Sequence, residues 1–131
     1  MSGGRGQGVW TTRPIAVKTA TGSVGVEAAV LGDWAVHLAT RPPGVPDYGL
    51  WAVTYLPVGY KLPYLFETEQ AARTAAADMD GLGDWRDAVP DGSQLLVDPE
   101  LKRLVSRACR SHGGFLETDA DVIIYLREVV G

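Results

Sequence analysis

The sequence predicts an α+β fold: an antiparallel β-meander of about four to five strands packed by one helix, followed by two C-terminal helices. Residues 15–66 hold short segments in which apolar and polar residues alternate, with turn residues between them. Three later segments repeat their apolar residues every three to four positions, the period of a helix. With 131 residues in all, we expect one α+β domain at 14–131 after a flexible, glycine-rich N-terminal arm at 1–13.

The first three strands are expected at residues 15–19, 23–30 and 34–39. Thr-Gly and Gly-Asp pairs separate them, and these residue types favour turns. Val24, Val26, Ala28 and Val30 give the second segment one apolar face. The third segment, Trp-Ala-Val-His-Leu-Ala, is echoed by residues 51–56, Trp-Ala-Val-Thr-Tyr-Leu. The echo is either an internal repeat or two aromatic-led strands of one meander, and we favour the meander.

The stretch from Gly49 to Leu82 predicts a strand, a turn, a return strand and a helix. A proline-rich loop at 40–48 precedes it, and Pro57-Val58-Gly59 is suited to the turn. Because Pro63 has no N–H, the return strand is expected at a sheet edge or with a bulge. Thr68 is the expected N-cap of the helix. Its apolar stripe comprises Ala72, Ala75, Ala76, Met79 and Leu82.

Asp98-Pro99-Glu100 marks the start of a second helix, with an N-cap, a proline at the first position and an acid in the first turn. Gly113-Gly114 is expected to stop it. Thr118 would then cap a last helix, which carries Val122, Tyr125, Leu126, Val129 and Val130 on one face. A closing strand at 122–126 is the competing interpretation, since Val-Ile-Ile-Tyr is also rich in strand formers.

The composition narrows the class of protein. The net charge is −4, and the single cysteine, Cys109, allows no intramolecular disulfide. No apolar run approaches the length of a membrane helix, and the first eight residues lack the apolar core of a secretion signal. We therefore expect a cytoplasmic protein that neither binds a membrane nor carries a cofactor.

No catalytic or metal site is predicted. Cys109 and His112 have the spacing of half a zinc site, yet the only other histidine is His37, which lies in a strand. A packing cysteine and a histidine at a helix end explain the pair, and a thiol nucleophile with its base lacks an orienting group. His37 is either a general base beside Asp33 or Asp47, or a side chain on the solvent face of its strand, which we favour.

Two charged features are candidate binding surfaces. Arg103, Arg107 and Arg110 form a basic stripe on the outer face of the helix at 99–112, suited to phosphates or an acidic partner. The second feature is an acidic loop with one aromatic anchor for a basic partner surface. This loop is built on Asp84, Trp85, Asp87 and Asp91.

The segment Leu50-Trp-Ala-Val-Thr-Tyr-Leu-Pro-Val-Gly, with the Leu-Phe-Glu-Thr and alanine-rich helix that follow, resembles small uncharacterised proteins from actinobacteria and their phages or mobile elements. The order strand, strand, helix is also similar to the DNA-binding domains of some integrases, although this hairpin offers only Lys61 as a basic residue. We expect a non-enzymatic accessory or inhibitory factor that binds a protein. The alternatives are a nucleic-acid-binding regulator that uses the basic helix and a small enzyme without a recognisable motif.

Overall fold

The computed structural model describes residues 9–19, 22–39, 48–57, 59–81, 99–120 and 122–123. Within them the chain forms one antiparallel sheet whose six strands are ordered as they occur in the sequence, β1-β2-β3-β4-β5-β6. The α+β meander is therefore confirmed, with one strand more than expected. The strands are β1 (Thr11–Thr19), β2 (Gly22–Leu31), β3 (Trp34–Leu38), β4 (Trp51–Tyr55), β5 (Tyr60–Phe66) and β6 (Phe115–Leu116).

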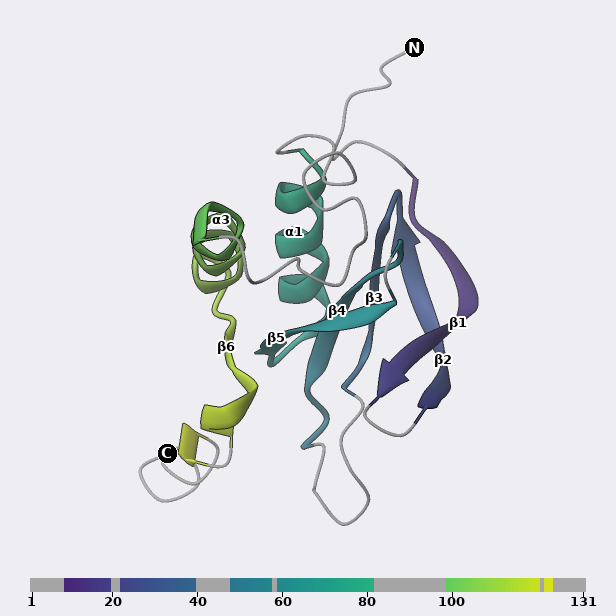
Figure 1. Ribbon diagram of the computed structural model, residues 1–131, viewed down its shortest axis with the longest axis horizontal. Helices are drawn as coiled ribbons and strands as arrows, with labels where there is room; N and C mark the ends of the chain where they lie inside the picture. The colour runs from purple at the N-terminus through teal and green to yellow at the C-terminus, as the bar shows by residue number, and fades with distance from the viewer. Residues whose placement is uncertain are drawn as a thin grey trace.

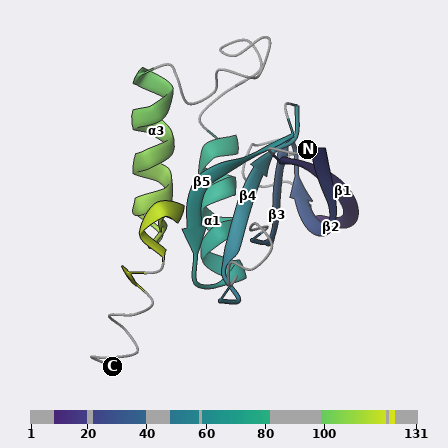
Figure 2. The same cartoon turned by 60° about the horizontal axis from the view of Figure 1, so that its bottom comes forward.

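Two helices cover one face of the sheet (Figures 1 and 2). Helix α1 (Glu69–Asp80) lies across β3, β4 and β5, and helix α3 (Pro99–Arg110) lies beside α1. The expectation of one covering helix was therefore too low. Both helices are needed because the strands leave a wide apolar surface on this side.

Helix α1 forms where the local signals predict it. The Thr68 hydroxyl accepts a hydrogen bond of 3.1 Å from the Ala71 N–H, which satisfies one of the free donors at the helix start. The helix ends at Asp80, with Gly81 as C-cap. Four of the five predicted stripe residues, Ala72, Ala75, Ala76 and Met79, are buried. Leu82 lies outside the described residues.

Pro63 coincides with an irregularity in strand β5. Ala52 pairs with Leu65 and Thr54 pairs with Lys61. Four residue steps along β5 therefore correspond to two steps along β4. This is a bulge, as the missing proline N–H predicts. The bulge is not at the sheet edge, because Tyr64 and Leu65 pair onward with β6.

The sheet curls so that its first strand meets the turn between β4 and β5. The Lys18 N–H donates a hydrogen bond of 2.8 Å to the carbonyl of Gly59, and the Lys18 ammonium lies 5.2 Å from the centre of the Tyr60 ring. Gly59 has φ of +80°, as its place in the predicted turn requires. Curling covers part of the sheet face that α1 does not reach.

Both faces of the sheet are therefore buried. The face toward the helices holds Trp34, Val36, Val53, Tyr55 and Phe66, packed on α1 and α3. The second face carries two separate apolar clusters. One comprises Ile15, Val17, Ala28, Val30 and Ala35; the other comprises Ala39, Leu50, Ala52, Leu65, Phe115 and Ala120.

The two ends of the described chain differ from the expected boundaries. Strand β1 begins at Thr11, so residues 11–13 of the expected N-terminal arm belong to the sheet. Trp10 packs against the helix-facing core, and the Arg73 guanidinium lies 5.0 Å from the centre of its ring. The first strand therefore begins four residues before its expected start at residue 15.

At the C-terminal end, β6 pairs with β5 and leads into a short 3-10 helix, η1 (Glu117–Asp119). Thr118 therefore lies inside η1, and η1 has no side-chain cap. Residues 120, 122 and 123 are helical, which favours the predicted last helix over the competing strand at those positions. The rest of that segment, like the loop at 40–47, lies outside the described residues.

Candidate partner-binding surface on α3

Helix α3 is amphipathic. Val105, Ala108 and Cys109 are buried against the helix-facing core, and Leu104 is partly buried beside them. At 100° per residue, Arg103, Arg107 and Arg110 fall on the opposite side of the helix, where all three are exposed. The structure therefore brings the three predicted arginines together on one outward side, and we call them the arginine face.

The C-terminal end of α3 is fixed by two glycines. Gly113 has φ of +82°, and its N–H donates to the Arg110 carbonyl at 3.1 Å. The Gly114 N–H donates to the Cys109 carbonyl at 2.8 Å, which completes a Schellman motif. A Cβ at Gly114 would lie only 2.8 Å from both that carbonyl oxygen and the Phe66 ring. The glycine pair thus stops the helix, as predicted, and lets its end approach the sheet.

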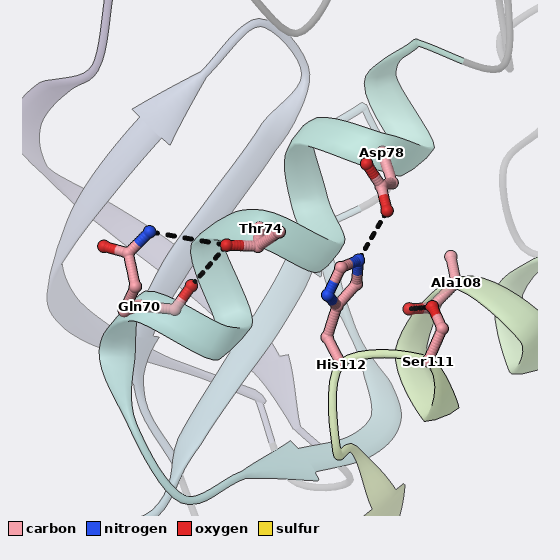
Figure 3. A network of polar contacts seen from close by, with 6 residues as sticks. All are labelled: Gln70, Thr74, Asp78, Ala108, Ser111 and His112. Carbon is pink, nitrogen blue, oxygen red and sulfur yellow. Dashed lines mark hydrogen bonds and ion pairs between the residues drawn. The ribbon is translucent and has the colours of Figure 1, made fainter.

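His112 joins the ends of the two helices (Figure 3). Its Nε2 lies 2.5 Å from the Asp78 carboxylate on α1, and the pair is accessible to solvent. Ser111, the residue before His112, donates its hydroxyl hydrogen to the Ala108 carbonyl on α3 at 3.0 Å. His112 therefore belongs to the docking of α3 on α1, which agrees with its predicted place at a helix end.

The three arginine side chains differ in their contacts. Arg103 donates to both carboxylate oxygens of Glu100, at 2.5 and 2.7 Å, and this contact raises its pKa. Arg110 donates from Nε to the Ser106 hydroxyl at 3.2 Å, and its guanidinium lies 5.6 Å from the centre of the Tyr64 ring. The side chain of Arg107 makes no hydrogen bond or ion pair within the part of the chain that the structure describes. The face therefore offers one uncommitted and one pre-oriented guanidinium.

The other predicted surface cannot be placed. Asp84, Trp85, Asp87 and Asp91 lie outside the described residues. The acidic loop therefore remains a prediction from the sequence.

A buried polar pair lies on the second face of the sheet, between its two apolar clusters. His37 and Thr54 are both 0% exposed, and Nε2 of His37 lies 2.7 Å from Oγ1 of Thr54. The predicted solvent position of His37 is wrong because the curled sheet and the C-terminal segment cover this face as well. Nδ1 of His37 lies 2.7 Å from the Leu38 carbonyl, which only accepts, so Nδ1 carries a proton.

Burial determines the protonation state of His37 and keeps the pair away from solvent. Burial lowers the pKa of His37, with a smaller lowering contribution from the charge of Lys61, so the ring is neutral at pH 7. Nε2 then accepts a hydrogen bond from the Thr54 hydroxyl. The arrangement of hydroxyl, imidazole and orienting carbonyl is that of a nucleophile and its base, but neither side chain reaches solvent. It acts as a satisfied polar contact in the core.

An ion pair between β5 and η1 lies on the C-terminal side of the region around His37. Lys61 Nζ lies 2.6 Å from a Glu117 carboxylate oxygen, and both side chains are mostly buried. It ties β5 to η1 and so helps to hold the cover over His37. No local signal in the sequence indicates this contact, because its two residues lie 56 positions apart.

Two further candidates from the sequence are a reactive thiol and a metal site. Cys109 is buried, and burial raises its pKa to about 12, so the thiol stays protonated at neutral pH. Across the described ranges no group of three or more histidine, cysteine or acidic side chains is arranged to hold a metal ion. Of the helices described, none is long and apolar enough to cross a membrane.

Comparison of the chain with protein-family models, with curated proteins and with solved structures found no match in any of the three.

Proposed function

We propose that this chain is a small non-enzymatic binding protein that holds an acidic protein partner through the arginine face of α3. The observation that carries the proposal is the orientation of Arg103, Arg107 and Arg110, which leave α3 on the side away from the core. Helix α3 carries four positive charges against one negative, a net of +3, in a chain whose net charge is −4. This local excess of positive charge favours an acidic contact surface.

The fixed end of α3 supports this role. The Schellman motif, the contact of His112 with Asp78 and the burial of Cys109 hold the helix on the domain. A helix held in this way loses little further conformational freedom on binding. Arg110 is oriented in advance by Ser106 and Tyr64, and its remaining N–H donors suit a carboxylate.

Nucleic acid is the second candidate, and the number of charges disfavours it. Arg103 and Arg110 are seven residues apart, or about 10 Å along the helix, and the three arginines neutralise at most about three phosphates. A protein whose affinity for DNA depends steeply on salt makes about six to ten such contacts. The overall negative charge of this chain adds repulsion from a polyanion. An acidic patch on a protein presents far less total charge, so a protein partner is favoured.

An enzyme is the third candidate. The described pair that most resembles catalytic groups, His37 with Thr54, is fully buried and its hydrogen bonds are satisfied. A role as accessory or inhibitory factor fits a small binding protein of this kind and agrees with the resemblance to phage and mobile-element proteins.

Capture from an actinobacterial lysate tests the proposal. The tagged full chain is compared with Arg107→Glu, which reverses the uncommitted arginine, and with Arg13→Glu, which makes the same charge change at an exposed position of β1. We expect a defined protein that survives nuclease treatment, is retained by Arg13→Glu and is lost with Arg107→Glu. Equal capture by both variants would overturn the assignment of the surface, and capture that depends on nucleic acid would promote the second candidate.

A further inference from the structure

We propose that Ser106 is a phosphorylation site that switches off the arginine face of α3. The inference rests on the proposed function, because it assigns a means of regulation to the same surface.

Ser106 is partly exposed in the middle of α3, at the border of the arginine face. Lys102 and Arg103 precede it by four and three residues, and Arg107 and Arg110 follow it by one and four. Residues three and four apart are neighbours on a helix surface, so three of these cations lie within reach of the hydroxyl. For Arg110 the structure gives the contact directly, 3.2 Å from Nε to Oγ at the surface. Among the described residues, no acidic side chain forms a hydrogen bond with Ser106 that would compete with the contact to Arg110.

The reaction requires a nucleoside triphosphate and a protein kinase with an acidic substrate groove. Oγ of Ser106 attacks the γ-phosphorus and forms a new O–P bond, while the bond to the bridging oxygen breaks and the nucleoside diphosphate leaves. The hydroxyl proton passes to a carboxylate base of the kinase. Arg103 lies three residues before the serine, and its positive charge is the feature that the acidic groove of the kinase recognises. The segment around Ser106 opens locally for this step, as helices in folded proteins do at a free-energy cost below that of global unfolding.

The phosphate would change the surface without unfolding it. A phosphoserine carries nearly two negative charges at pH 7, so the net charge of α3 falls from +3 to about +1. Its oxygens accept hydrogen bonds from Arg110 and Lys102, each one helical turn away. The guanidinium that is pre-oriented for a partner then binds the phosphate within the chain, and the acidic partner is repelled.

The first experiment does not depend on any partner. The full chain and its Arg103→Ala and Arg13→Ala variants are incubated with ATP and an arginine-directed serine kinase, and the modified residues are mapped by mass spectrometry. We expect phosphate on Ser106, reduced about tenfold by Arg103→Ala and unchanged by Arg13→Ala. A wild-type chain left unmodified at Ser106, or equal modification of all three chains, would overturn the proposal.

The second experiment measures the effect of the phosphate. The full chain is prepared with genetically encoded phosphoserine at position 106, and its phosphorus resonance is titrated. We expect an apparent pKa below the usual value of about 6, restored toward that value by Arg110→Ala. A normal value in the wild-type background would remove the assigned contact and overturn the proposal, whether or not a partner has been found.

The last comparison uses the captured partner. Phosphorylation is expected to weaken binding at least tenfold, whereas removal of the phosphate by a phosphatase restores binding to within about twofold of the unmodified chain. Equal binding by the phosphorylated and unmodified chains would overturn the switch. If Arg107→Glu had already failed to affect capture, the fault would lie in the proposed surface and not in the modification.

Discussion

His37 and Thr54 are linked across two neighbouring strands by a contact of 2.7 Å between Nε2 and Oγ1. Both side chains are completely buried on the face of the sheet that the helices do not cover. The pair is satisfied only while the imidazole is neutral and the hydroxyl donates. The stability of the fold therefore depends on pH through the protonation of His37.

Stability is expected to fall as the pH is lowered below about 6.5, the pKa of an unfolded histidine. Because burial lowers the pKa of His37 in the folded state, the unfolded chain binds the proton first, and the free energy of unfolding rises with pH in this window. The contribution of one group is at most about 1.4 kcal/mol per pH unit. Urea denaturation at pH 7.5 and 5.0 measures it. His37→Gln, which does not titrate, should show a smaller difference between the two pH values, and an equal difference would contradict the assignment.

Thr54→Val is expected to destabilise the fold by about 1–3 kcal/mol, because it leaves a buried histidine nitrogen without its donor. The same substitution in a His37→Leu background removes both partners and should cost less than about 1 kcal/mol. Chemical denaturation of the four chains gives the coupling energy. An equal cost in both backgrounds would show that the contact contributes nothing.

The glycine pair after α3 gives a matched comparison. Gly114→Ala should cost more than about 2 kcal/mol, because its Cβ would meet the Phe66 ring and the Cys109 carbonyl. Gly113→Ala should cost only about 1 kcal/mol, because it has positive φ but open space around it. Thermal melting of the two variants ranks them. The reverse order would contradict the close approach of the helix end to the sheet.

Cys109 should be inert in the folded protein, because it is buried and its thiol pKa is raised to about 12. An aromatic disulfide reagent at pH 7.5 is expected to label less than about 5% of the chain within an hour, and one thiol per chain after denaturation. Rapid stoichiometric labelling of the native protein would contradict the packing of α3. The measurement also reports how often α3 leaves the core.

Local signals in the sequence predicted the elements that depend on nearby residues. The Thr68 cap, the start of α3 at Pro99 and its stop at Gly113 were all confirmed. The helical period also placed the arginine face correctly, since the buried stripe fixes the direction of the opposite side. Each of these features depends on residues that lie within one or two helical turns of one another.

Contacts between distant residues could not be predicted in this way. Strand β6 has only two residues, too few for any alternation to show. His37 was placed in solvent because nothing near it in the sequence reveals that β1 and the C-terminal segment cover its face of the sheet. The link between Ser106 and Arg110 follows the i, i+4 spacing of a helix and could have been found from it.

The most direct test of the account is the affinity of the purified partner for three chains: wild type, Arg107→Glu and Arg13→Glu. Titration calorimetry at about 50 and 200 mM salt measures it. We expect Arg107→Glu to weaken binding at least tenfold, or about 1.4 kcal/mol, at low salt, with a smaller loss at high salt, while Arg13→Glu stays within about twofold of wild type. Equal affinities for the two variants at both salt concentrations would contradict the assignment of the arginine face as the binding surface.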